Sequence, residues 1–112
     1  ISCWNTSNVA QFGLTFMRAT AFNQDISSWN VGNAVDLKRM FHGASSFNQN
    51  LSAWDVSSVL TSAFAFQDAE SFNNVLCWNL PQKADVEDMF CGSAGRFDSL
   101  CSSTLTIYMS ER

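Results

Sequence analysis

Tryptophan recurs along this chain at an almost constant interval, and this interval constrains the fold more than any other feature of the sequence. Trp4, Trp29, Trp54 and Trp78 are 25, 25 and 24 residues apart. Periods of about 20 to 50 residues are typical of repeat proteins, in which one unit cannot bury its own apolar face and stacked units build a continuous core. The spacing therefore predicts a stack of similar units.

Other residue types keep the same phase, so we expect equivalent side chains to pile up in ladders. Phenylalanine follows each tryptophan by 12 residues and the first three by 18, where it precedes an asparagine. Those asparagines are predicted to be buried and to bond backbone groups. The fourth unit slips by one residue between positions 92 and 95. The ladder positions are Trp4, Trp29, Trp54 and Trp78; Phe16, Phe41, Phe66 and Phe90; Phe22, Phe47 and Phe72; and Asn23, Asn48 and Asn73.

One unit is interpreted as a strand, a short helix and a return loop. Trp29 and Val31 alternate as they would on one face of a strand over residues 26–31. Leu37, Met40, Phe41 and Ala44 have the spacing of one helical face, which predicts a helix over 35–44. The expected fold is a right-handed, leucine-rich-repeat-like α/β solenoid of about four such units with short parallel strands.

The unit boundaries follow from the period. Four tandem repeats are expected at about 1–25, 26–50, 51–75 and 76–101, followed by a capping segment over 102–112. Leu105, Ile107 and Met109 alternate in that segment, which predicts an edge strand over the last unit. Residue 1 falls partway through a unit and no cap precedes it. We therefore expect further repeats upstream and possible self-association through this end.

Charge and hydrophobicity disfavour two classes of partner. Charged residues make up 14% of the chain, the net charge is −4, and the basic residues are scattered. Nucleic-acid binding requires a concentrated basic surface, so it is not expected. Apolar runs fall well short of the roughly 20 residues that cross a bilayer, so direct membrane insertion is not expected either.

The repeat itself resembles a known family. Residues 22–31 (FNQDISSWNV) and 47–56 (FNQNLSAWDV), with the later Met40, Phe41 and Ala44, are similar to the 25-residue unit of BspA-like surface proteins. That family is a leucine-rich-repeat relative first described as a domain of unknown function, and the cysteine-bearing last unit is closer to its algal and diatom versions. The resemblance implies a secreted or surface-exposed protein, with adhesion proposed for some members, and it supplies no catalytic residues.

The cysteines lack the paired spacing of a zinc site and suggest a disulfide in the last unit, hence an oxidising compartment. Cys91 with Cys101 is the preferred pair and Cys77 with Cys101 the alternative. Cys3 and Cys77 would lie about 14 Å apart at strand spacing, beyond disulfide reach. The competing interpretation is that all four are small buried apolar residues.

Other candidate sites are weak. His42 is expected to be an exposed residue without a catalytic partner. Asp85, Glu87 and Asp88 are interpreted as the solvated start of a helix rather than a calcium loop. Asn5 and Asn50 lie in N-glycosylation sequons. No catalytic, cofactor-binding or metal-binding residue is assigned.

The function predicted from these features is that of a non-catalytic extracellular or cell-surface module. It would act as a structural or adhesive scaffold, or bind protein or glycan through a Ser/Asn/Thr-rich face, with no cofactor. The alternative is a subunit of an extracellular filament or matrix that assembles by stacking of solenoid ends. An enzyme is not expected.

Overall fold

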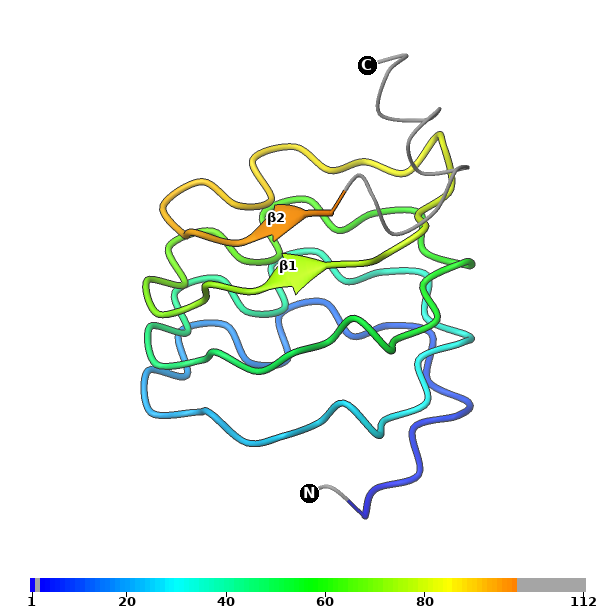
Figure 1. The fold of residues 1–112 in the computed structure, drawn as a ribbon. Helices are drawn as coiled ribbons and strands as arrows, with labels where there is room; N and C mark the ends of the chain where they lie inside the picture. Colours follow the sequence, from blue (N-terminus) through cyan, green and yellow to red (C-terminus); the bar gives the residue numbers. More distant parts are fainter. Residues whose placement is uncertain (2, 99–112) are drawn as a thin grey trace.

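The computed structural model describes residue 1 and residues 3–98, and in it the chain winds in turns that lie one above another (Figure 1). Backbone hydrogen bonds join each turn to the next. The Phe12 N–H donates to the carbonyl of Asp36 over 2.9 Å, and the Leu37 N–H donates to the carbonyl of Thr61 over 2.8 Å. Residues about 25 positions apart in the sequence are therefore neighbours in space.

The described residues contain no helix, so the predicted α/β solenoid of strand–helix units is wrong. Where the helix was expected, the chain makes three overlapping four-residue turns, the middle one closed by the His42 N–H, which donates to the carbonyl of Arg39 over 3.2 Å. The Met40 N–H donates to the carbonyl of Leu37 over 3.1 Å, and the Ala44 N–H donates to that of Phe41 over 3.0 Å. The first and third of these turns start and end on buried residues. The apolar spacing of this segment therefore mimics a helical face without helical hydrogen bonds.

Left-handed backbone conformations prevent these segments from becoming helical. In this segment, which belongs to the second winding of the chain, Arg39 has φ 58° and Gly43 has φ 70°. Such conformations cost L-residues roughly 1–2 kcal/mol inside a helix, so two of them four positions apart break it. Three further pairs occupy equivalent positions: Leu14 and Arg18, Phe64 and Asp68, and Asp88 and Gly92.

Regular strands are also rarer than expected. Within the described residues they are β1 (Val75–Leu76) and β2 (Arg96–Phe97), which pair in parallel with Val75 opposite Arg96. The predicted strand over 26–31 does not form, because the chain turns there and the Trp29 N–H donates to the carbonyl of Ile26 over 3.0 Å. Isolated parallel bridges elsewhere join successive turns: Gln11 with Asp36, Asp36 with Thr61, and Thr61 with Asp85.

Aromatic rings fill the interior between the two sides of each turn. Phe41 stacks on Phe66 with ring centroids 5.2 Å apart, and Phe47 stacks on Phe72 at 6.0 Å. Within a turn, Phe41 and Phe47 lie 4.2 Å apart. The four rings are buried, whereas those nearer the two ends are half-buried: Phe16, Phe22 and Phe90.

Tryptophan couples the turns by hydrogen bonds as well as by contact. The indole N–H of Trp54 donates to the carbonyl of Ile26 over 3.1 Å, and that of Trp78 donates to the carbonyl of Leu51 over 2.8 Å. Trp29 donates in the same way to Ile1. Trp29, Trp54 and Trp78 are buried, while Trp4 is 60% exposed. A buried indole N–H needs such a partner, so each ring holds its turn in register on the preceding one.

The expected capping strand over 102–112, with Leu105, Ile107 and Met109, lies outside the described residues. Among the residues that are described, no helix has the length and apolar character needed to span a bilayer.

Candidate functional site

A row of asparagines runs across the turns on the side of β1. The side-chain oxygen of Asn23 accepts the backbone N–H of Asn48 over 2.8 Å, and that of Asn48 accepts the N–H of Asn73 over 2.9 Å. All three side chains are exposed, so the expectation that they are buried is wrong. The bonding is to backbone groups, because a surface amide can reach the N–H of the next turn.

Neighbouring polar groups extend this row. The side-chain amide of Gln49 donates to both the backbone and the side-chain oxygen of Asn23, each over 3.0 Å. The side-chain amide of Asn74 donates to the side-chain oxygen of Asn48 over 2.7 Å. These bonds hold the amides in fixed orientations at the surface. We call the polar face the set Asn23, Asp25, Ser27, Asn48, Gln49, Asn50, Ser52, Asn73 and Asn74.

A shallow recess of about 390 Å³ lies within the polar face. Asp25 and Ser27 border it on one turn, and Gln49, Asn50 and Ser52 border it on the next. Hydrogen bonds from the side chain and the backbone N–H of Ser27 lower the pKa of Asp25, so its carboxylate is charged at neutral pH. The recess thus combines one negative charge with amides and hydroxyls.

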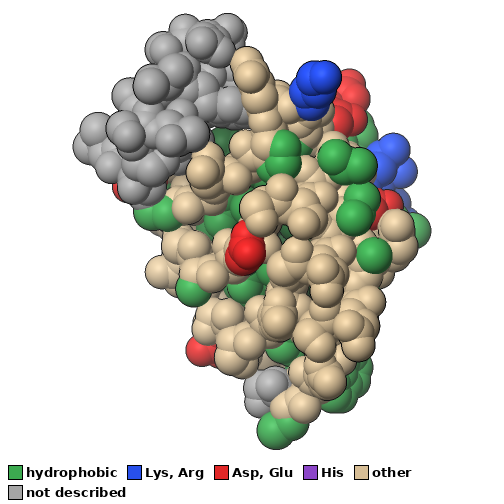
Figure 2. Space-filling model, turned by 90° about the vertical axis from the view of Figure 1, so that its right-hand side faces the viewer, with side chains coloured by type: hydrophobic (Ala, Val, Ile, Leu, Met, Phe, Trp, Pro, Cys, Tyr) green, Lys and Arg blue, Asp and Glu red, His purple; other side chains and the backbone are tan. Residues whose placement is uncertain are grey.

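Turn corners carry a second set of polar side chains. The side-chain oxygens of Asn5, Asn30 and Asp55 accept the N–H two residues further on, over 3.1, 2.9 and 3.0 Å. The side-chain and backbone hydrogen bonds of Ser57 lower the pKa of Asp55. Figure 2 views the molecule from the right of Figure 1, and the surface it shows is mostly uncharged and polar, with few carboxylates.

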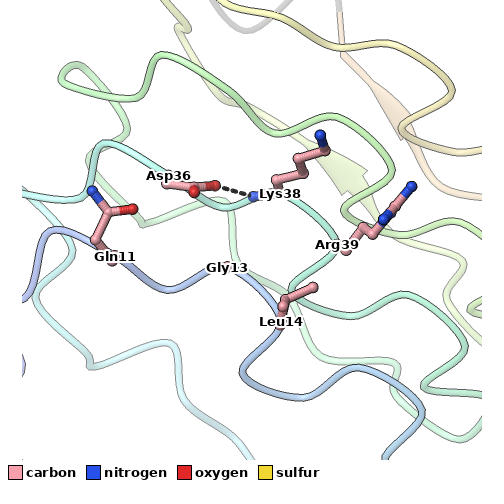
Figure 3. Close-up of a pocket in the computed structure, with 6 residues that line it drawn as sticks. All are labelled: Gln11, Gly13, Leu14, Asp36, Lys38 and Arg39. Carbon is pink, nitrogen blue, oxygen red and sulfur yellow. Dashed lines mark hydrogen bonds between the residues drawn. The ribbon is translucent and has the colours of Figure 1, made fainter.

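A different recess, of about 330 Å³, lies beside Asp36 (Figure 3). It is open because Gly13 has no side chain; a Cβ there would approach the Asp36 carboxylate to 3.2 Å. Asp36 accepts the backbone N–H of Lys38 over 2.7 Å. The charged ends of Lys38 and Arg39 point away from Asp36 (Figure 3). The lining groups do not converge on one point, which a small-molecule site requires.

The sequon asparagines are both exposed, and both form such turns. Asn5 also accepts the hydroxyl of Ser7 over 2.7 Å, and Asn50 accepts the N–H of Ser52 over 2.9 Å.

Cys91 is an exposed free thiol, so the preferred pairing of Cys91 with Cys101 is not found. The Cys91 backbone N–H donates to the carbonyl of Asp88 over 3.3 Å and so closes a turn at the surface, which places the residue outside the core. Cys3 is likewise free and exposed, so neither residue is the buried apolar cysteine of the competing interpretation. The alternative pair, Cys77 with Cys101, includes a residue outside the described part of the chain and stays a prediction.

The remaining candidates are placed differently from expectation. His42 is half-buried rather than exposed, and its Nδ1 is buried without a hydrogen-bond partner among the described residues. Asp85, Glu87 and Asp88 are exposed and lie on consecutive turns, not at a helix start. No group of three His, Cys, Asp or Glu side chains within 1 and 3–98 lies close enough to hold a metal ion.

Of the residues that border the recess, sequence reasoning named Asn50, as a sequon, and missed Asp25, Ser27, Gln49 and Ser52. Gln24 and Gln49 follow Asn23 and Asn48 in the same phase, so the repeated Asn-Gln pair was a visible signal. What the repeat could not indicate is that the amides bond across turns and stay at the surface.

Comparison with known proteins gives a family but no characterised relative. No curated protein and no solved structure matches this chain. Residues 1–103, which include every described turn, match a family profile over most of the chain's length. The chain therefore belongs to the family described as Mycoplasma protein of unknown function, DUF285.

Proposed function

We propose that this chain is a non-catalytic, BspA-like repeat module, exposed outside the cell, that binds glycan through the polar face. The supporting observation is the set of amide groups held in fixed orientations by hydrogen bonds between turns. Groups that are already ordered lose little conformational entropy on binding. Amides, hydroxyls and one carboxylate can donate to and accept from the hydroxyls of a sugar.

A glycan is favoured over a protein partner by what the polar face lacks. Protein interfaces are dominated by exposed aromatic and other large apolar anchors. Five large apolar side chains are exposed among the described residues, and none of them belongs to the polar face: Ile1, Trp4, Leu14, Met17 and Leu60. A shallow, polar and largely uncharged surface suits a polyhydroxylated ligand better.

Binding of the chain to a panel of immobilised oligosaccharides tests this proposal. The variant Asp25→Ala with Asn50→Ala removes exposed groups from both sides of the recess. We expect it to bind the retained oligosaccharide at least about tenfold more weakly, since two hydrogen bonds of roughly 1 kcal/mol each are lost.

Lys38→Ala is the matched control, because Lys38 is exposed but lies in the Asp36 recess. This variant should bind as the parent chain does, and circular dichroism should show that both variants keep the parent fold. Failure of the parent chain to retain any oligosaccharide, or equal loss in the control, would contradict the proposal.

A further inference from the structure

The polar face repeats from turn to turn, and this repeat decides how a ligand can lie on it. The side-chain oxygen of Asn23 accepts two bonds from the next turn, from the Asn48 N–H over 2.8 Å and from the Gln49 amide over 3.0 Å. The side-chain oxygen of Asn48 does the same, accepting the Asn73 N–H over 2.9 Å and the Asn74 amide over 2.7 Å. One set of groups therefore recurs at an interval of one turn.

These bonds leave each turn with one ordered donor and one ordered acceptor. An amide oxygen has two lone pairs, so the oxygens of Asn23 and Asn48 are fully used and the –NH2 group of each remains. Neither –NH2 group donates a hydrogen bond to any described residue. Gln49 and Asn74 are held by their own –NH2 groups, and their side-chain oxygens are not buried and accept nothing from the described part of the chain. A ligand that runs from turn to turn would meet the same pair of groups each time.

The distance between turns is similar to the length of a sugar unit. Phe22, Phe47 and Phe72 directly precede the three asparagines, and their successive ring centroids lie 5.7 and 6.0 Å apart. A hexose in an extended polysaccharide advances the chain by a similar distance, and each of its hydroxyls can donate and accept. Consecutive sugar units can therefore use the same donor and acceptor on consecutive turns.

The way in which neighbouring turns join on this face changes along the stack. The Ser52 hydroxyl donates to the carbonyl of Val75 over 3.1 Å and accepts the Cys77 N–H over 3.2 Å, so it bridges two turns. At the following junction β1 and β2 pair directly. Between residues 23–29 and 48–54, by contrast, no backbone hydrogen bond joins the described turns. The recess lies at this third kind of junction.

Two side chains of the recess prevent a serine bridge from forming there. Ser27 is the equivalent of Ser52, but its hydroxyl is bonded to Asp25 in its own turn. The Ser52 N–H, which would bond to Ser27, donates instead to the side-chain oxygen of Asn50 over 2.9 Å. Val75 occupies the equivalent position at the bridged junction and has no side-chain acceptor. Asp25 and Asn50 therefore keep polar groups of both turns available to a ligand.

We propose that the polar face binds an uncharged, linear polysaccharide that lies along the direction in which the turns follow one another, with consecutive sugar units on consecutive turns and the edge of one unit in the recess. This inference rests on the proposed glycan binding and adds the class and the direction of the ligand.

Charge selects the class of polysaccharide. Asp25 is the only ionisable residue of the polar face, and its carboxylate repels uronate and sulfate groups. A polycationic chain would need a repeated acid, but the equivalent residue on the next turn is Asn50, which is uncharged. The remaining groups are amides and hydroxyls, which match the hydroxyls of an uncharged chain.

Isothermal titration calorimetry against oligosaccharides of increasing length tests the direction of the ligand. The probes are linear oligomers derived from cellulose, chitin, mannan and xylan, each from one to about six units long. We expect at least one series to bind at least about tenfold more tightly as a tetramer than as a dimer, because the added units reach further turns. Oligomers of polygalacturonate should bind at least about tenfold more weakly than this series.

Asn73→Ala tests whether the ligand extends beyond the recess. Its backbone N–H stays in place, and its exposed side chain forms no hydrogen bond with the described residues. We expect this variant to bind the tetramer about fivefold more weakly and the dimer as the parent chain does. Asn79→Ala is the matched control, because Asn79 is an exposed asparagine that follows Trp78 and lies outside the polar face. This control should bind both oligomers as the parent does.

Three results would each overturn the lengthwise arrangement: equal affinities for dimer and tetramer, tetramer binding that Asn73→Ala leaves unchanged, or tighter binding of the polygalacturonate oligomers. Glycan binding confined to the recess, and lost in the variant Asp25→Ala with Asn50→Ala, would then still support the proposed function. Absence of binding to any glycan would refute both.

Discussion

Phe47 is the residue whose truncation most directly tests how the turns are held together. Its ring is fully buried and lies 4.2 Å from Phe41, 5.7 Å from Phe22 and 6.0 Å from Phe72, measured between ring centroids. One of these partners is in the same turn and one is in each neighbouring turn. Phe47→Ala therefore removes the contact that links three turns and leaves a cavity between stacked rings.

The magnitude follows from burial and stacking. A buried Phe→Ala change costs about 3–5 kcal/mol, and stacked ring pairs contribute roughly 0.5–1.5 kcal/mol beyond their area. We expect the free energy of unfolding to fall by about 4 kcal/mol, a large part of the roughly 5–15 kcal/mol of a typical domain. With an m-value near 2 kcal/mol per molar urea, the unfolding midpoint should fall by about 2 M.

Equilibrium urea unfolding followed by tryptophan fluorescence measures this shift. Phe64→Ala is the matched control, because Phe64 is half-exposed and its ring lies under Arg39 at 4.9 Å. It should cost about 1 kcal/mol. If Phe47→Ala costs no more than this control, the rings do not couple the turns and the packing argument is refuted.

Two further results are expected. Gly95→Ala should destabilise the fold by about 1–3 kcal/mol in the same urea assay, because its Cβ would lie 2.5 Å from Phe72 Cδ2. Gly32→Ala is the control and should change stability by less than about 0.5 kcal/mol, because the next turn has Ser57 at this position. Equal effects of the two substitutions would contradict the packing at Gly95. Ser27→Ala should raise the pKa of Asp25, measured by NMR titration of its side-chain carbonyl. Because the pKa of Asp25 is lowered in the folded chain, the Asp25 carboxylate stabilises the fold above the ordinary pKa of 3.8, and this stabilisation is lost as the pH falls through the lower folded value. An unchanged titration of Asp25 in the Ser27→Ala variant would refute the Ser27 hydrogen bonds.

The sequence by itself determined the period and the identity of the packed rings. Trp29 and Trp54, or Phe41 and Phe66, are 25 residues apart, and that is one turn of the chain. Aromatic residues that recur in phase with small apolar ones need a common interior, so their position could be predicted without coordinates. Family membership was also readable, from the repeated FNQ and SW or AW pattern around residues 22–31 and 47–56.

Only the tertiary structure decided the local conformation and the surface. The spacing of Leu37, Met40, Phe41 and Ala44 fits a helix and a series of overlapping four-residue turns equally well. Among the described residues, glycine marks only two of the eight left-handed positions, Gly43 and Gly92. The choice is made by the neighbouring turn, whose carbonyls take the alternate N–H groups that a helix would use internally. The same neighbouring turn supplies the N–H groups of Asn73 and Asn74 that the exposed Asn48 side chain accepts, and one repeat alone cannot show these bonds.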